Sequence, residues 1–394
     1  MNTIETHLLQ LSIGFGPRPV GSAQNRAAQQ YIAEVLASAG FEVELQPFAC
    51  MDWQFDSASL TLNGEPLAFT PNLYTLPCDV FGPFARLGSL GELEASHLQG
   101  RFAVLEGELA KEPLMPKNFV FWNPEEHQTI IRLLEEKRPL AVLAISPQET
   151  HYPPVFEDGD FALPSVTLPV SAGERLAQSP QGELHLRIDC RRYPSSGANV
   201  IARRAGQKAG KIVVCAHLDT KPDTPGALDN ATGVSVLLAL AQALSARTER
   251  LPFGLEIIAY NGEDYYSAPG QMAYLGSAPQ WQEIVLAINV DGAGWREAPL
   301  SLALFECPPQ LAESLRRLAA EFPQLAEVAP WPQGDHMLFV MNGVPAVALS
   351  SQGAEVLLER VIHTPNDTSD LVSVERLAQA VAFILRVLDE LLPA

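Results

Sequence analysis

The sequence has few basic residues, and this shortage narrows the classes of partner the protein can have. It contains 26 lysines and arginines against 46 aspartates and glutamates, which gives a formal net charge of -20 at pH 7. A surface of this sign repels the phosphates of nucleic acids and of anionic lipids. We therefore expect no nucleic-acid partner, whereas metal ions and cationic ligands are compatible with the acidity.

Cysteine is also scarce. The five cysteines are odd in number, scattered along the chain, and form no C-x-x-C pair: Cys50, Cys78, Cys190, Cys215 and Cys307. This distribution argues against a disulfide framework and against a zinc site built from thiolates. Any metal site must take its ligands from other residue types.

Long apolar segments are missing as well. No uninterrupted apolar run reaches the ~18 residues of a membrane-spanning helix, and the N-terminal segment MNTIETHLLQLSIGFGPRPVG lacks the basic start and apolar centre of a signal peptide. We therefore expect a cytoplasmic protein with no membrane partner. The sequence leaves the oligomeric state open.

The 394 residues fall into parts with two different patterns of apolar residues. Residues 23–39 have helical spacing and precede a strand beginning at Phe41, and from Ala198 onward predicted strands and helices alternate regularly. Between these parts, residues 50–192 contain short apolar runs broken by proline and glycine, with one clear helix at 124–137. The sequence therefore predicts a discontinuous domain of residues 1–49 and 193–394, interrupted by an inserted β-rich subdomain of residues 50–192.

The alternation predicts an α/β fold for the discontinuous domain. We expect a three-layer sandwich in which helices cover a twisted, mixed but mostly parallel sheet. Three hydrophobic runs, Lys211–Asp219, Gly254–Asp264 and Glu283–Asp291, are predicted to be buried strands, and each run ends in histidine or acid. Open α/β sheets bind ligands at the carboxyl ends of their strands. The polar residues at these ends are therefore candidates for a functional site.

Two of the candidates come from one predicted strand. His217 and Asp219 are two residues apart, so they point to the same face, and His217 could bind a metal while Asp219 accepts its other ring N–H. Asp229 follows in a glycine-containing loop just before a predicted helix. An aspartate there could cap the helix, or it could bridge two metal ions with one oxygen on each.

The remaining candidates follow the next two runs and a late loop. Glu263 and Asp264 are adjacent, so one could carry a proton while the other holds a metal. Asp291 precedes the glycine-containing segment GAG, and His363 begins the polar loop HTPNDTSD. Each residue also has an ordinary structural interpretation when taken alone, and only the combination points to a site.

Imidazole nitrogens and carboxylate oxygens are ligands that zinc accepts. Two zinc ions that share a carboxylate can also polarise a carbonyl and activate water. Cobalt and manganese can use the same ligands. Two histidines, three aspartates and one further glutamate are therefore sufficient for a two-metal hydrolase.

The motifs HLD, PGALDNATG, GED, NVDG, GDHMLF and HTPNDT occur in that order. Together they resemble the co-catalytic dizinc aminopeptidases, a metallopeptidase family that includes bacterial leucyl aminopeptidase, glutamate carboxypeptidase and glutaminyl cyclase. The resemblance covers Ala198 to the C-terminus and the N-terminal segment that begins GPRPVGS. It implies the zinc exopeptidase fold and places the insertion where many relatives carry a protease-associated or lid-like subdomain.

The resemblance also implies a set of metal ligands. One zinc ion would be held by His217 and Asp291 and the other by Asp264 and His363, with Asp229 bridging the two. Relatives commonly have a second glutamate at the position of Asp264, so this ligand is one methylene shorter here.

The roles of the two remaining residues follow from the same resemblance. Glu263 corresponds to the general base, and Asp219 to the partner of His217. The resemblance therefore implies an aminopeptidase that removes N-terminal residues from peptides, with a zinc-bridging hydroxide attacking the scissile carbonyl.

Other functions of the same fold remain open at this point. A glutaminyl cyclase would use a single zinc, but cyclases tend to have serine where Asn230 follows the bridging aspartate. A carboxypeptidase or N-acyl amino acid hydrolase would need arginine for a substrate carboxylate, for which Arg296 is a candidate. A non-catalytic binding module would have lost ligands. His336, with its neighbour Asp335, lies in a motif near the site, and the sequence does not define its role.

Overall fold

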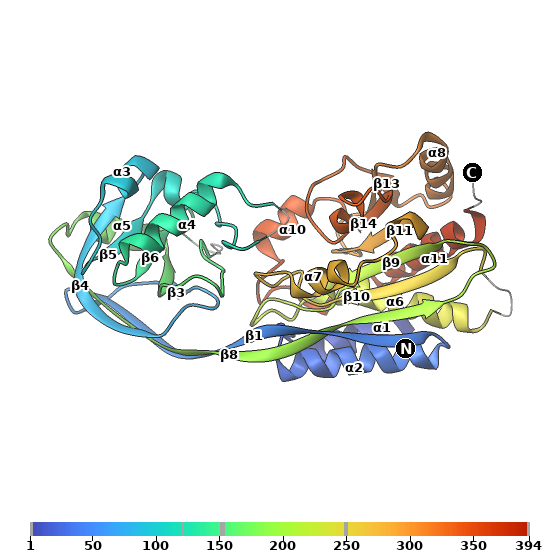
Figure 1. Cartoon of the computed structure of the whole chain (residues 1–394), viewed down its shortest axis with the longest axis horizontal. Coiled ribbons are helices and arrows are strands. Elements are labelled where there is room, and N and C mark those ends of the chain that lie inside the picture. Colours follow the sequence, from blue (N-terminus) through green and yellow to red (C-terminus); the bar gives the residue numbers. More distant parts are fainter. Residues whose placement is uncertain (1–2, 120–121, 150–153, 248–250, 392–394) are drawn as a thin grey trace. The chain divides into compact units, whose positions relative to one another are not determined.

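The computed structural model describes residues 3–119, 122–149, 154–247 and 251–391 (Figure 1). The chain divides into two compact units, one comprising Met1–Cys50 and Ser195–Ala394 and the other Met51–Pro194. Two long strands, β1 Glu42–Leu62 and β8 Glu183–Arg204, run across the boundaries between these ranges. The sequence predicted only the first part of β1 and the last part of β8 as strand.

A mixed sheet forms the centre of the first unit, with the strand order β13-β12-β14-β11-β9-β10-β8. Its four middle strands are parallel, namely β14 Ala346–Ser351, β11 Ile284–Val290, β9 Lys211–His217 and β10 Gly254–Tyr260. At the sides, β12 Leu300–Phe305 runs antiparallel to β14 and pairs in parallel with β13 Leu325–Glu327, while β8 runs antiparallel to β10. The predicted mixed, mostly parallel sheet is confirmed, and the carboxyl ends of the middle strands meet at one edge.

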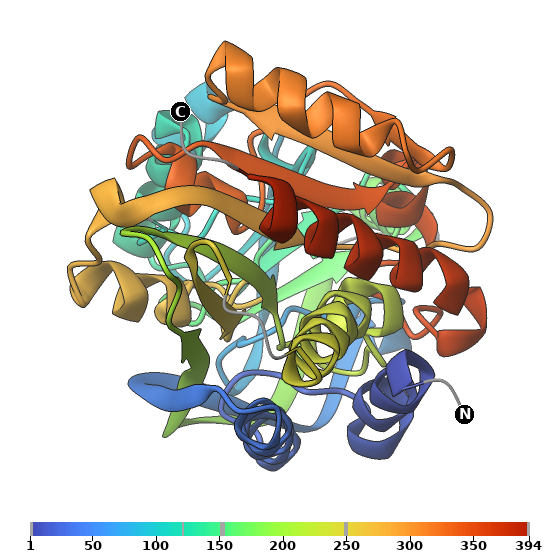
Figure 2. The same ribbon diagram turned by 90° about the vertical axis from the view of Figure 1, so that its right-hand side faces the viewer.

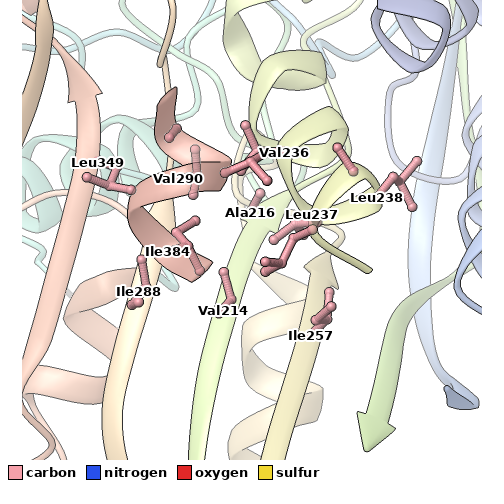
Figure 3. Packing of buried hydrophobic residues seen from close by; sticks show 14 of the residues in the cluster. Val214, Ala216, Val236, Leu237, Leu238, Ile257, Ile288, Val290, Leu349 and Ile384 are labelled. Atoms are coloured by element: carbon pink, nitrogen blue, oxygen red, sulfur yellow. The ribbon is translucent and has the colours of Figure 1, made fainter. Parts of the chain in front are cut away.

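The middle strands are buried on both faces, which explains their nearly continuous apolar sequences. Val214 and Ala216 of β9 join the same hydrophobic core as Ile257 of β10 and Ile288 of β11 (Figure 3). Since side chains alternate along a strand, Val213, Cys215 and His217 of β9 face the opposite side. The strand therefore contributes its even-numbered residues to the core and delivers His217 at its end to the other face.

Helices cover both faces of this sheet and complete the predicted three layers. On the core side, α6 Thr232–Ser245 packs on β9, β10 and β11 and contacts α11 Val374–Glu390, α1 Thr3–Leu9 and α2 Ala23–Ser38 (Figure 2). On the other side, α9 His336–Val340 packs on β14 and β11. The remaining helical segments of the unit are η1 Gln10–Phe15, η3 Ala227–Ala231, α7 Pro269–Gly276, η4 Trp281–Glu283, α8 Pro309–Ala319, α10 Ala354–Arg360 and η5 Ser369–Leu371.

One helical stretch of the described residues, Ala227–Ser245, is long and apolar enough to cross a membrane by length and composition. Within this structure 89% of it is buried, as expected for the central helix of a protein core.

The second unit contains its own sheet. Four strands run parallel, namely β4 Cys78–Leu87, β5 Phe102–Leu105, β6 Val142–Ile145 and β7 Ser165–Leu168, and β3 Thr70–Pro71 is antiparallel to β7. Along β5, Ala103 and Leu105 belong to one hydrophobic cluster and Phe102 and Val104 to another. The helical segments are α3 Leu90–Ala95, η2 Gly107–Ala110, α4 Glu125–Lys137 and α5 Val170–Ala177, while the short β2 Glu65–Pro66 pairs with β1. The unit thus contains several helices besides the strands that dominated the prediction.

Candidate metal centre

All five predicted ligands belong to the first unit and lie at the ligand-binding edge of its sheet. His217 is the last residue of β9, Asp264 follows β10, and Asp291 directly follows β11. Asp229 lies in η3 just before α6, and His363 follows α10. Segments from five parts of the chain therefore deliver imidazole and carboxylate groups to one place.

The Asp229 carboxylate lies between the two histidines. Its Oδ1 is 2.9 Å from Nε2 of His217, and its Oδ2 is 3.1 Å from Nε2 of His363. One oxygen is thus directed at each imidazole. This is the arrangement a carboxylate needs to bridge two metal ions, and a helix cap would not require it.

Each histidine has a second acid beside it. Nε2 of His217 lies 3.5 Å from Oδ1 of Asp291, and Nε2 of His363 lies 2.9 Å from Oδ1 of Asp264. The structure therefore brings the five residues together in the same two pairs that the family resemblance implies. Ligand atoms of His217, Asp229 and Asp264 all fall within 4.8 Å of one another, a spacing that suits a bound metal ion.

Buried nitrogen atoms provide an independent test of whether a metal fits. The His217 side chain is 1% exposed, yet neither ring nitrogen makes a hydrogen bond of suitable geometry among the described residues, although Asp229 Oδ1 lies 2.9 Å from Nε2. The Asp264 Oδ2 atom is buried and equally without a hydrogen-bond partner there. Buried polar atoms are costly unless something satisfies them. Zinc or a similar cation would satisfy these atoms, so the residues fit the implied metals.

The electrostatics of the cluster lead to the same conclusion. Burial alone would lower the pKa of His217, but the charge of Asp291 and the contacts with Asp219 and Asp229 raise it well above its ordinary value. The same holds for His363. Burial lowers its pKa, but the charges of Asp264 and Asp229 and its contacts with them have the larger effect and raise the pKa well above the ordinary value. Burial opposes ionisation of Asp229 too, but contacts with both histidines lower its pKa. The negative carboxylates around the two histidines therefore stabilise a positive charge at this place. Metal cations can supply that charge instead of protons on the imidazoles.

Asp219 lies beside His217 as predicted, but its hydrogen bonds go to other groups. Its Oδ1 lies 3.7 Å from Nδ1 of His217, which is too long for a hydrogen bond. Its carboxylate instead accepts backbone N–H bonds from Gly262 at 2.7 Å, Glu263 at 3.3 Å and Asp264 at 3.0 Å. Asp219 therefore anchors the segment that carries both the candidate base and a candidate ligand.

Glu263 lies beside this cluster. Burial raises the pKa of its carboxyl group well above the usual value, and the charges of Asp264 and Asp291 add to the effect while that of His217 opposes it. A carboxyl group with a raised pKa is a better proton acceptor than an ordinary glutamate. The environment of Glu263 is thus suited to moving a proton.

Two residues that support the Asp229 segment were not singled out from the sequence. Asp367, fully buried, accepts backbone N–H bonds from Leu228 at 2.7 Å and Asp229 at 3.0 Å. Burial and the nearby charge of Asp229 raise the pKa of Asp367 to about 7. Its motif HTPNDT was noted, but only because of its histidine.

The second supporting residue is Arg18, which is fully buried. Its guanidinium donates to the carbonyls of Leu218 at 3.0 Å and Gly226 at 3.0 Å, and also to those of Leu11, Gly16 and Pro225. It thereby joins the loop after β9 to the N-terminal segment. The only signal in the sequence was the turn-rich GPRPVG, which does not reveal where the arginine points.

His336 and Asp335 do not approach the five ligands through any hydrogen bond of the described residues. Nε2 of His336 lies 3.2 Å from the Trp331 carbonyl, and its ring packs against Phe305. Asp335 accepts a hydrogen bond from the side chain of Gln271 at 2.7 Å, and burial raises the pKa of Asp335 to about 7. These contacts tie His336 to Trp331 and Asp335 to Gln271, while the charge of Asp335 still acts on that of His217.

Arg296 forms hydrogen bonds with backbone carbonyls away from the five ligands. Its guanidinium donates to the Val372 carbonyl at 3.1 Å, and its backbone N–H donates to Leu371 at 2.8 Å. These contacts bind it to the segment before α11. They give no support to a role in binding a substrate carboxylate.

Sequence comparison identifies the domain that contains this cluster. Residues 199–388, which include all five candidate ligands, match the profile of peptidase family M28. This part of the chain is a family M28 peptidase domain. Among characterised proteins, aminopeptidase YwaD of Bacillus subtilis is 23% identical to this chain over 384 residues, an alignment that spans 94% of this chain and 80% of YwaD.

Solved structures resemble this chain over nearly its whole length. An aminopeptidase from Aneurinibacillus sp. strain AM-1 superimposes with a TM-score of 0.79 at 21% identity, covering 98% of this chain and 93% of that chain. BSAP, a zinc aminopeptidase from Bacillus subtilis, gives 0.75 at 21% identity over 98% and 95% of the two chains. A glutaminyl cyclase from Porphyromonas gingivalis gives 0.54 at 17% identity over 99% and 97%. The zinc exopeptidase fold expected from the sequence is confirmed.

Proposed function

We propose that this protein is a metal-dependent aminopeptidase that holds two zinc ions and removes N-terminal residues from peptides. The observation that carries the proposal is the placement of Asp229, which directs one oxygen at His217 and the other at His363. Membership of family M28 and similarity to aminopeptidases over most of the chain support the reaction class.

The proposed roles follow from the geometry of the cluster. His217 and Asp291 would hold one ion, Asp264 and His363 the other, and Asp229 would contact both. Bound zinc supplies Lewis acidity, which polarises the scissile carbonyl and makes water more acidic. The ligands therefore serve to fix the positions of these charges.

Proton transfer is assigned to Glu263, whose pKa is raised by burial. Its carboxylate accepts a proton from the attacking water and delivers it to the nitrogen of the leaving amine. Asp219 fixes the backbone that carries Glu263 and Asp264 by accepting hydrogen bonds from the N–H groups of residues 262–264. A proton carrier and a metal ligand are therefore positioned by one buried carboxylate.

Glutaminyl cyclase chemistry is the alternative within the same fold. The cyclase superposition is weaker than those of the aminopeptidases. Asn230 stands where cyclases tend to have serine, and its side chain is used internally, donating to the Val290 carbonyl at 2.9 Å. Aminopeptidase activity is therefore the better supported reaction.

The decisive experiment compares fluorogenic aminoacyl amides with the same amides acetylated at the amino group. Each set is assayed before chelator treatment, after it, and after restoring Zn²⁺, Co²⁺ or Mn²⁺. We expect hydrolysis of the free amino substrates only, lost with chelation and regained with metal. Equal hydrolysis of acetylated substrates, or cyclisation of an N-terminal glutamine peptide without hydrolysis, would overturn the proposal.

We also propose that the protein acts in the cytoplasm. Cys78, Cys190, Cys215 and Cys307 form no disulfide bond, which is compatible with a reducing compartment. Fractionation of source cells with an antibody to the full chain tests this location, and recovery outside the cytoplasmic fraction contradicts it.

A further inference from the structure

Lys221 brings a positive charge to one half of the metal centre. Its Nζ donates a hydrogen bond to the backbone carbonyl of Asp264 at 2.9 Å and lies 3.8 Å from Oδ1 of the same residue. That Oδ1 is the atom that lies 2.9 Å from Nε2 of His363. The ammonium group therefore approaches the oxygen that would bind the second ion.

The position of Lys221 is fixed by the loop that carries it. Two residues earlier, Asp219 accepts the backbone N–H of Asp264 at 3.0 Å. Asp264 is thus held at its N–H by Asp219 and at its carbonyl by Lys221. The Lys221 side chain is only 14% exposed, so water and salt screen its charge weakly.

The other metal position has the opposite electrostatic surroundings. His217 has Asp291 at 3.5 Å and Asp219 at 3.7 Å from its ring nitrogens. Within the described part of the chain, Asp291 has no lysine or arginine within ion-pair distance. One position is therefore surrounded by acids, whereas the other has a cation beside its shortened ligand.

We propose that Lys221 makes the two metal positions unequal by lowering the affinity for a divalent cation at Asp264 and His363. This inference rests on the proposed two-metal function and adds a positioning residue to it. Repulsion between a single and a double positive charge at this range weakens binding roughly tenfold even with the screening of bulk water. The position at His217 and Asp291 is then the tighter one.

The test is a titration of the metal-free, full-length protein with Co²⁺, followed by calorimetry and visible absorption. The variants are Lys221→Met, which removes the charge at similar length, and Lys221→Arg, which retains it. Lys208→Met is the matched control, because Lys208 precedes β9 at the opposite end of the strand. His363→Ala identifies which binding step belongs to the position at Asp264.

We expect two unequal binding steps in the wild type, with the weaker step missing in His363→Ala. Lys221→Met should strengthen this weaker step about tenfold and leave the stronger one unchanged, while Lys221→Arg and Lys208→Met should resemble the wild type. If a folded Lys221→Met, checked by circular dichroism, binds the second ion with unchanged or lower affinity, the inference is wrong and the two-metal proposal still holds. If the wild type binds fewer than two ions, the two-metal proposal itself fails, and this inference fails with it.

Discussion

Asp367 accepts a hydrogen bond from the backbone N–H of Asp229 at 3.0 Å, so one buried acid orients another. The companion bond from Leu228 to the same carboxylate fixes the preceding residue. Because Asp367 fixes the backbone of Asp229, the Asp229 side chain can direct one oxygen to each histidine. The bridging geometry is therefore a property of the surrounding loop as well as of the ligand.

Replacing Asp367 with alanine should destabilise the protein. The change leaves the buried N–H groups of Leu228 and Asp229 without acceptors, which costs about 2–4 kcal/mol in the free energy of unfolding. Urea denaturation of the metal-free protein measures this loss.

Asp370→Asn is the matched control for that experiment, because Asp370 lies in the same loop, is exposed, and bonds only to Thr368 among its described side-chain partners. It should change the free energy of unfolding by less than about 0.5 kcal/mol. Equal unfolding midpoints for Asp367→Ala and the wild type would contradict the anchoring role.

Replacing Glu263 with glutamine should remove the proton carrier and preserve the metal ligands. We expect kcat to fall about 10²- to 10⁴-fold, the range associated with loss of general acid–base catalysis. Metal content by elemental analysis should match that of the wild type. Retained peptidase activity in this variant would remove Glu263 from the mechanism.

Replacing Asp229 with asparagine should affect both metal positions, since its two oxygens lie beside different histidines. We expect both metal affinities to fall by more than about 100-fold, beyond the loss seen when only a supporting residue is changed. His363→Ala should release one ion and retain the other. Elemental analysis after dialysis distinguishes these results, and a full metal complement in Asp229→Asn would show that this residue is no bridge.

His7 should make stability depend on pH. Burial lowers its pKa despite the hydrogen bond with Gln242, and Tyr31 lies 2.6 Å from its Nδ1. Because the folded pKa is below the unfolded value of about 6.5, the unfolded chain binds the proton more readily. The stabilisation from neutral His7 is present above pH 6.5 and is lost as the pH falls through the folded value.

Unfolding by urea across this pH window, compared between the wild type and His7→Gln, isolates the contribution of His7 from that of the other histidines. The variant should show a shallower loss of stability on acidification. Parallel curves would mean that His7 titrates alike in both states.

The sequence allowed the strands and ligands to be predicted because their signals are local. An apolar run such as Lys211–His217 defines a buried strand, and a polar residue at its end lies at the sheet edge whatever the rest of the chain does. His217, Asp264 and Asp291 were found this way, whereas Asp229 and His363 lie in loops, and only the order of the five residues and the surrounding motifs made them a set.

The supporting contacts could not be predicted because they join residues distant in sequence. Arg18 meets the Leu218 carbonyl, and Asp367 meets the Asp229 N–H, through the packing of separate segments. Asp219 binds the 262–264 backbone rather than His217 because its oxygens lie 2.7–3.3 Å from those N–H groups and 3.7 Å from Nδ1 of His217. Such choices are made by the tertiary structure and leave no periodic pattern in the sequence.

Arg18 and Asp367 also determine when the catalytic apparatus can exist during synthesis of the chain. The guanidinium near the N-terminus and the carboxylate near the C-terminus hold neighbouring parts of the segment that leads to Asp229. A ribosome-bound fragment that ends before His363 lacks both the second imidazole and the carboxylate behind the bridge. Since chains fold progressively as they emerge, the metal centre can assemble only after synthesis has passed Asp367.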